Sequence, residues 1–154
     1  MKVGVLTISD RSARGERADE GGPLVDRIVA AAGNEVVVRA VVPDERADIE
    51  AILKEWSDGG AIDLILTTGG TGLGARDVTP EATRAVIDKE APGIAEAMRA
   101  AGAVHTPMAA LSRQVAGARG TTLIVNLPGS PKAIQEGLDA VMEILPHAVE
   151  MLHS

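Results

Sequence analysis

The stretch DLILTTGGTGLGARDVTPEAT, residues 63–83, decides the fold because it joins three different local signals. A short apolar run comes first, then a glycine-rich segment, then a threonine followed by a proline. The apolar run predicts a buried strand, and Pro80 after Thr79 is typical of the start of a helix. The stretch therefore predicts a strand, a loop and a helix in that order. Its glycines are Gly69, Gly70, Gly72 and Gly74.

The rest of the chain repeats this alternation of strand and helix. Consecutive apolar residues in most of the predicted strands are expected where helices cover both faces of a parallel sheet. We predict an α/β fold, a three-layer doubly wound, mostly parallel sheet with helices on both faces. The predicted strands cover residues 2–8, 35–42, 63–68 and 121–127, and helical spacing covers residues 24–32, 49–56 and 134–152.

Two features of the remaining sequence are less regular. Residues 91–119 are rich in alanine but interrupted by proline and glycine, which predicts one or two short helices with loops. Asp19 and Thr79 stand where helix N-caps are expected. With no linker or repeat in its 154 residues, we expect residues 1–154 to form a single domain.

Composition excludes several classes of function. The net charge of −7 and a single aromatic residue, Trp56, argue against nucleic acid as a partner, because such proteins use basic surfaces and aromatic stacking. The absence of cysteine excludes disulfides, thiolate metal sites and a cysteine nucleophile. No apolar run is long enough to span a membrane. We expect a cytoplasmic protein with no membrane partner.

The glycine loop has two interpretations. Successive glycines let backbone N–H groups turn toward an anion, and a helix N-terminus that follows favours the same charge, so the loop suits a phosphate. Glycines also serve tight turns with no function beyond the turn. The loop is neither a Walker loop, since no Lys-Ser or Lys-Thr pair follows, nor a good dinucleotide fingerprint. Both interpretations stay open on the glycines alone.

Two further loops follow predicted strands and should share an edge of the sheet with the glycine loop. VPDE places Asp44 after the second strand, and LPGSPKA places Lys132 at the start of the last predicted helix. A lysine is disfavoured at a helix N-terminus unless an anion lies nearby, although a solvent-facing lysine is an equal alternative. Asp44 has a simple alternative as a turn residue after Pro43. Asp77 and Asp44 together with phosphates would form an oxygen-rich magnesium site.

Taken in order along the chain, these motifs resemble a known family. ISDR, VPDE, TTGGTG, RDVTPEAT, LSR and NLPGSPKA are similar to the motifs of the MogA/MoaB molybdopterin adenylyltransferases, which include the G domain of gephyrin. The resemblance covers essentially the whole chain. It is far more specific than a single glycine pattern, because the motifs keep their order and spacing.

The resemblance implies a nucleotidyltransferase of molybdenum cofactor biosynthesis. Such an enzyme transfers AMP from ATP to the terminal phosphate of molybdopterin with the help of Mg²⁺, and releases pyrophosphate. A homotrimer is implied as well, with contacts to other cofactor-biosynthesis proteins. The alternative is a molybdopterin-binding paralogue without adenylylation activity, because it would share every motif.

The resemblance also implies site residues. Asp44 and Asp77 match the family's functional aspartates, as catalytic residues and metal ligands. The loop between Gly72 and Asp77, which contains Arg76, departs from the pattern of other members and leaves the role of Arg76 open. The residues that match cofactor-binding and substrate-binding positions are Ser9, Asp10, Gly69, Gly70, Thr71, Gly72, Ser112, Arg113, Pro128, Gly129, Ser130 and Lys132.

Overall fold

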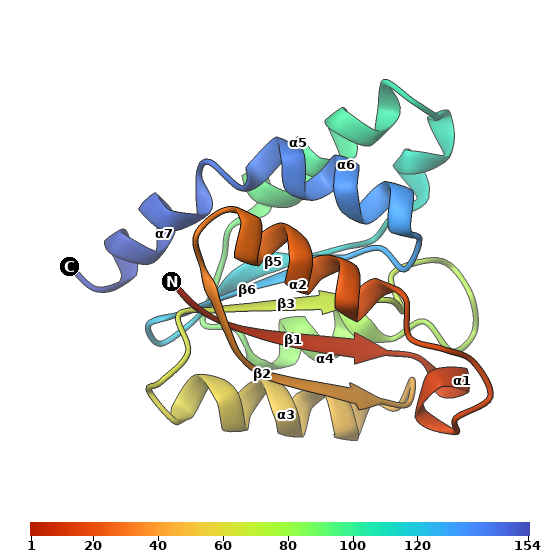
Figure 1. The fold of residues 1–154 in the computed structure, drawn as a ribbon, viewed down its shortest axis with the longest axis horizontal. Helices are drawn as coiled ribbons and strands as arrows, with labels where there is room; N and C mark the ends of the chain where they lie inside the picture. Colours follow the sequence, from red (N-terminus) through yellow and green to blue (C-terminus); the bar gives the residue numbers. More distant parts are fainter.

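A six-stranded sheet forms the middle layer of the computed structural model, which describes residues 1–154 (Figure 1). The strand order across the sheet is β2-β1-β3-β6-β5-β4. The four strands expected from the sequence pair in parallel, so the predicted fold class is confirmed. The strands are β1 (Lys2–Ile8), β2 (Glu35–Val42), β3 (Leu64–Thr68), β4 (Lys89–Glu90), β5 (Ala116–Arg119) and β6 (Thr122–Leu127).

The sequence did not predict the two strands at one edge of the sheet. β5 pairs antiparallel with β6, and β4 pairs antiparallel with β5. Both strands are short, with two residues in β4 and four in β5. Their sequences, KE and AGAR, carry neither a continuous apolar run nor a clear alternation. Pairing within the sheet, of β5 with β6 and of β4 with β5, therefore determines these strands, and local sequence preference does not.

Helices cover both faces of the sheet, in the layers that Figure 1 shows above and below the strands. A short helix, α1 (Asp10–Ala13), and a 3₁₀ turn, η1 (Pro107–Leu111), lie outside these layers. One layer contains α2 (Gly21–Ala31), α5 (Pro92–Ala103), α6 (Pro131–Val141) and α7 (Leu145–Leu152), and the other contains α3 (Arg46–Asp58) and α4 (Thr79–Val86).

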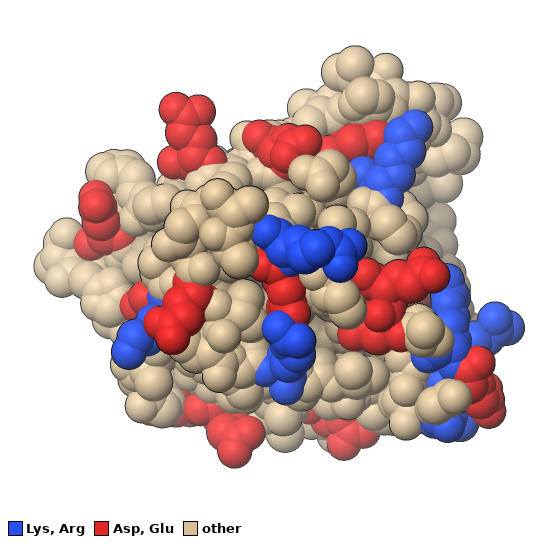
Figure 2. All heavy atoms as spheres, in the orientation of Figure 1, with Lys and Arg blue, Asp and Glu red and all other residues tan.

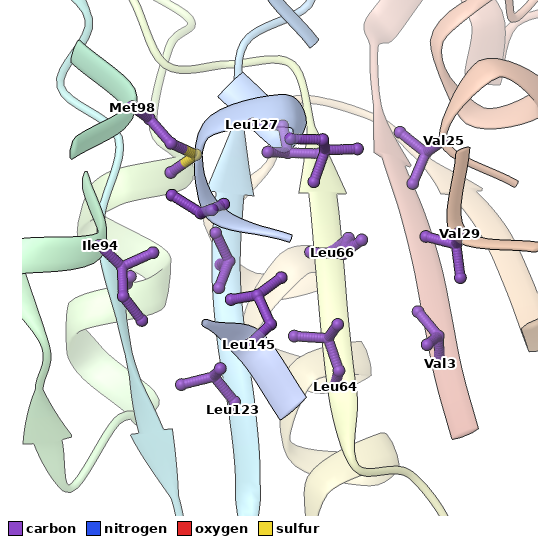
Figure 3. Close-up of a cluster of buried hydrophobic side chains, with 14 of the residues drawn as sticks. Val3, Val25, Val29, Leu64, Leu66, Ile94, Met98, Leu123, Leu127 and Leu145 are labelled. Atoms are coloured by element: carbon purple, nitrogen blue, oxygen red, sulfur yellow. The ribbon is translucent and has the colours of Figure 1, made fainter. Parts of the chain in front are cut away.

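Alternation along the central strands divides the core between the two faces. Val3 and Val5 of β1 pack with Val25 and Val29 of α2, as Figure 3 shows for three of the four. Leu6, the next residue of β1, belongs to the cluster between the sheet and helices α3 and α4. Successive side chains of a strand point to opposite faces, so a strand covered by helices on both sides is apolar throughout.

The prediction of one C-terminal helix over residues 134–152 is wrong in one respect, because the structure contains two helices there. α6 ends at Val141 and α7 begins at Leu145. Pro146 lacks the N–H group that a continuous helix would need at this point, and its ring clashes with the preceding turn. The chain therefore bends, and α7 packs Leu145 and Val149 onto the sheet.

The predicted N-caps are displaced by about one residue. Thr79 is the first residue of α4, after Val78, and its buried hydroxyl donates to the Gly69 carbonyl at 2.9 Å. Asp19 lies one residue before the N-cap of α2, yet its carboxylate accepts the Gly22 N–H at 3.0 Å. Both side chains therefore hold the start of a helix in place.

The doubly wound topology determines where a site can form. The connections through α2 and α3 lie on opposite faces of the sheet, so the winding reverses beside β1. Ligands of such folds bind outside the carboxyl ends of the strands near this point. In Figure 1 the arrowheads of β1, β2 and β3 all point to the side where α1 lies.

A buried amide fixes α4 relative to the sheet. Asn126 of β6 donates to the hydroxyls of Thr67 in β3 and Thr83 in α4, at 3.0 and 2.9 Å. Its side-chain oxygen accepts the Val115 N–H at 3.1 Å. Since each buried polar group in this network has a partner, α4 and the loop before it have a defined position. None of the helices has the length and apolar character needed to cross a membrane.

Candidate functional site

Two aspartates join the loops after β1 and β2. The N–H of Asp10 donates to Asp44 Oδ2 at 2.8 Å, and the N–H of Asp44 donates to Asp10 Oδ1 at 2.9 Å. Each carboxylate therefore accepts the backbone N–H of the other residue, and charge-assisted bonds of this kind are stronger than neutral ones. The pair fixes the direction of both carboxylates at the carboxyl edge of the sheet.

Arg76 attaches the glycine loop to this pair. Its guanidinium donates to both carboxylate oxygens of Asp10 at 3.1 Å and to Glu45 at 2.7 Å. The hydrogen bond from Arg76 is the main reason why the pKa of Asp10 is lowered, with a further contribution from the Asp44 N–H. Arg76 is the residue whose role the sequence left open. It links the loops after β1, β2 and β3 through side-chain bonds alone.

Backbone conformation and close contacts within the chain require glycine at the first two positions of the glycine loop. Gly69 and Gly70 have φ angles of +99° and +70°, a region that other residues rarely adopt. A Cβ on Gly69 would collide with the Ile8 carbonyl, and one on Gly70 would collide with the Thr79 hydroxyl. The Gly70 position also faces Asp44, with its Oδ1 3.2 Å from where a Cβ would be. Internal packing therefore accounts for these two glycines.

Asp77 occupies the space beside the other two glycines of the loop. Its Oδ2 would lie 3.0 Å from a Cβ on Gly72 and 2.9 Å from one on Gly74. The Gly74 N–H donates to the same oxygen at 2.9 Å. Asp77 is therefore folded back over the loop that precedes it, toward the region that Asp44 faces.

The same loop presents backbone donors without acceptors. The N–H groups of Gly70, Thr71 and Gly72 donate to no acceptor in the chain, although the Gly69 N–H bonds to the Leu127 carbonyl at 3.2 Å. Successive free N–H groups in a glycine turn form a concave site for an anion. The loop can thus hold a phosphate group in addition to meeting its internal packing needs.

Arg113 holds the glycine loop in place through several hydrogen bonds. Its guanidinium donates to the carbonyls of Gly72 and Asp77, each at 2.8 Å, and to the Glu81 carboxylate at 2.6 Å. Its N–H donates to the Thr71 carbonyl at 2.8 Å. The hydrogen bond from Arg113 lowers the pKa of Glu81. Because the Thr71 carbonyl points toward Arg113, the free N–H of Gly72 in the same peptide group points away from it.

Asp44 and Asp77 bring two negative charges close enough to influence each other. Burial raises the pKa of the Asp44 carboxyl above its usual value, and the charges of Asp10 and Asp77 raise it further, against the lowering effect of the Asp10 N–H and Arg76. No three His, Cys, Asp or Glu side chains are grouped so that they could hold a metal by themselves. A cation bound here would need oxygen ligands from outside the chain.

The loop after β6 separates two cavities. The Thr68 hydroxyl donates to the Pro128 carbonyl at 2.8 Å, which fixes this loop against β3. The α2 cavity, of about 310 Å³, is polar and lies between the starts of α2 and α6. The α5–α6 cavity, of about 240 Å³, has methionine and alanine walls. Ser130 borders both cavities, and its hydroxyl caps α6 through the Ala133 N–H at 3.2 Å.

Most of the residues predicted for the site lie around these features. Ser9, Gly69 and Gly129 line the α2 cavity together with Ser130. Ser112 and Pro128 line the α5–α6 cavity. Lys132, at the start of α6, is different. Its side chain is 79% exposed, and its ammonium lies 4.0 Å from the Glu136 carboxylate. It lines neither cavity.

The chain is similar to known proteins over nearly its whole length. The family described as probable molybdopterin binding domain matches residues 4–147. The chain belongs to this family. A solved structure, the molybdopterin biosynthesis enzyme MoaB from Thermus thermophilus, has a TM-score of 0.93 and 53% sequence identity, with 98% of this chain and 95% of that chain covered.

Members of the molybdopterin binding family differ in total length. Molybdopterin adenylyltransferase from Helicobacter pylori J99 is 41% identical over 158 residues, which cover 99% of this chain and 88% of that protein. The molybdenum cofactor synthesis protein cinnamon from Drosophila melanogaster is 43% identical over 153 residues. These cover 99% of this chain, but the chain spans only 26% of the length of cinnamon.

Sequence reasoning did not predict Gln114 and Glu136, two of the polar residues that line the α5–α6 cavity, and gave Asp19 only a capping role. Glu136 lies one helical turn after Lys132, so the helical spacing of α6 was the available signal. Asp19 accepts the Thr7 hydroxyl at 2.7 Å and lines the α2 cavity. The position of Gln114 depends on the turn after η1, for which the sequence carries no signal.

The glycine loop leads to a prediction about Gly70→Ala. The new methyl group would meet the Thr79 hydroxyl in a backbone conformation with positive φ, so we expect the free energy of unfolding to fall by about 3 kcal/mol. Gly120→Ala is the matched control, since Gly120 has a φ of +57° with no atom within 4 Å of a Cβ, and should cost about 1 kcal/mol. Urea unfolding measures both. Equal losses would contradict the packing described here.

Proposed function

We propose that this protein transfers AMP from ATP to the terminal phosphate of molybdopterin, a step of molybdenum cofactor biosynthesis. One observation carries the proposal. Two aspartates face a glycine loop with three unbonded N–H groups, at the carboxyl edge of a sheet in the molybdopterin binding family. Relatives that cover 93–99% of the chain are named molybdopterin adenylyltransferase.

The reaction brings two polyanions together. A terminal phosphate oxygen of molybdopterin attacks the α-phosphorus of ATP, and the bond from this phosphorus to the bridging oxygen of the β-phosphate breaks. Pyrophosphate leaves with the electron pair of that bond. The barrier is dominated by charge repulsion and by positioning, so preorganised donors contribute most of the catalysis. The N–H groups of Gly70, Thr71 and Gly72 and the ammonium of Lys132 are the donors that this site offers.

The two aspartates fit a magnesium ion that is shared with the substrate. Asp44 Oδ1 and Asp77 Oδ1 accept no hydrogen bond within the chain, while their Oδ2 atoms are held by backbone N–H groups. Mg²⁺ in phosphoryl-transfer sites commonly has one or two carboxylate ligands and takes the rest from phosphates and water. When bound, it would neutralise charge on the ATP phosphates.

The aspartates act better as ligands than as bases. A phosphate nucleophile is already ionised near neutral pH, so no proton must be removed from it. Asp10 and Arg76 hold Asp44 in place, and Arg113 holds the backbone of the Asp77 loop. The chain therefore contributes mainly orientation and charge, as the proposed reaction requires.

A homotrimer belongs to the same proposal. Apolar side chains are exposed around the end of α5 and η1, the projection at the upper right of Figure 1, which is mostly uncharged in Figure 2. A cluster of exposed apolar side chains is typical of an interface between subunits. The exposed side chains are Val104, Met108, Leu111 and, on the glycine loop, Leu73.

Cytoplasmic location, a single domain and contacts with other biosynthetic proteins stay predictions.

The proposed roles of the aspartates predict the behaviour of Asp77→Asn and Asp44→Asn. Each change keeps the shape of the side chain but removes charge beside the phosphates, so we expect single-turnover adenylylation to slow by about 10²-fold. The double variant should be little slower than either single one, because residues that act as a unit are not additive. The measurement is product formation across a Mg²⁺ titration, with exposed Asp48→Asn as the control.

Stability separates this role from a structural one. Because the pKa of Asp44 is raised in the folded chain, the folded state holds that proton more tightly, and stability falls as pH rises above the ordinary value of 3.8. At pH 7 without metal, Asp44→Asn should therefore unfold at a temperature no lower than the wild type. A variant that melts early and keeps its rate when folded would show that Asp44 is only a turn residue.

The trimer is tested by sedimentation equilibrium at micromolar concentration. We expect a mass near three times the 15.8 kDa of the chain. Val104→Asp should lower this mass, since Val104 is 83% exposed and a charge there would oppose a buried interface. A wild-type protein that sediments as a monomer would rule out the trimer.

A further inference from the structure

The exposed tip of the glycine loop, residues 73–76, is attached to the rest of the chain through one side chain. No hydrogen bond joins residues 73–75 to any group outside the loop. The guanidinium of Arg76 is the exception, because it donates to the carboxylates of Asp10 and Glu45. The position of the tip beside the proposed phosphate site therefore depends on where Arg76 is held.

Arg76 keeps a donor group for a further anion. Its Nη1 forms no hydrogen bond in the chain, and its side chain is 56% exposed. The bond to Glu45 Oε1, at 2.7 Å, is shorter than the two bonds to Asp10, each at 3.1 Å. Short charge-assisted hydrogen bonds are strong ones, so Glu45 contributes much of the force that holds this exposed side chain.

Phosphates at the glycine loop would compete for Arg76. The charges of Arg76 and Asp77 both act on the Asp44 carboxyl, so the guanidinium lies near the place proposed for the ATP phosphates. Arginine binds phosphate through paired hydrogen bonds, as it binds a carboxylate. If Arg76 moved to a phosphate, it would withdraw its support from Asp10, whose N–H holds Asp44 Oδ2 at 2.8 Å.

We propose that Glu45 is a positioning residue for AMP transfer, and that it keeps Arg76 on Asp10 while ATP is bound. Asp44 then retains the orientation that a shared magnesium ion requires. The identity of the reaction rests on the proposed function. Glu45 directly follows Asp44, so one loop supplies both a proposed metal ligand and the group that preserves its orientation. Because Arg76 and Glu45 are both exposed, their ion pair contributes little to stability.

Glu45→Gln tests this role, because it removes the charge that retains Arg76 and keeps a side chain of the same size. The probe α,β-methylene-ATP, which cannot release pyrophosphate, should bind about three-fold more tightly with Mg²⁺, because Arg76 turns to its phosphates. Single-turnover adenylylation should slow by about ten-fold, because Asp44 loses support. Titration calorimetry measures the affinity. Tighter binding with slower turnover is not expected of a residue that only stabilises the fold.

Arg76→Gln supplies the second arm of the experiment. This variant should also slow turnover, but it should bind the analogue no more tightly than wild type. In its background, Glu45→Gln should have no further effect on affinity, because Glu45 acts only through Arg76. Glu90→Gln is the matched control, since Glu90 pairs with an arginine, Arg84, on the surface and lies in the edge strand β4. It should change neither affinity nor turnover.

The outcomes separate this role from simpler ones and from the proposed function. Unchanged affinity in Glu45→Gln would overturn the role. The same tightening in the Arg76→Gln background would also overturn it, because loss of a negative charge would then be the whole effect. Weaker binding with an earlier thermal midpoint would show that Glu45 is only structural. If the affinities change as expected but wild type forms no adenylylated product, the enzymatic proposal fails and the hold of Glu45 on Arg76 stands.

Discussion

The exchange of hydrogen bonds between Asp10 and Asp44 is the interaction on which the site depends. It joins loops that are 34 residues apart in the chain, and Arg76 extends the connection to the glycine loop. Doubly wound sheets bring these loops to one edge, but only side-chain bonds fix the carboxylates relative to the loop backbone. Arg113 holds the same loop through the carbonyls of Gly72 and Asp77. Orientation in the site is therefore built before any substrate arrives.

The charges of the site explain why it would need both a cation and substrate phosphates. The pKa of Asp44 is raised by burial and by the charges of Asp10 and Asp77, so the unliganded chain contains repulsion that a bound cation relieves. Free N–H groups in the glycine loop lack the acceptors that phosphates supply. A cation would offset the negative charge of the aspartates, and phosphates would accept the free N–H groups. Both agree with the proposed transfer of AMP between two polyanions.

The sequence predicted what local pattern determines. The bounds of β1 and β2, residues 2–8 and 35–42, agree with the structure because continuous apolar runs leave little choice. β4 and β5 were missed because their short sequences carry no strand pattern of their own, and only their pairing in the sheet, of β5 with β6 and of β4 with β5, makes them strands. The loop residues of the site came from matching motifs in order. The contacts of Arg76 and Arg113 could not be predicted, since their partners are set by how loops meet in space.

The central claim is that this chain transfers the α-phosphoryl group of ATP, with its adenosine, to molybdopterin. The most direct measurement uses ATP labelled at either the α- or the γ-phosphate in a single turnover with molybdopterin and Mg²⁺. We expect α-label in the pterin product and all γ-label in pyrophosphate, in equal amounts. Label from the γ-phosphate in the pterin product, or no label in it from either position, would contradict the account.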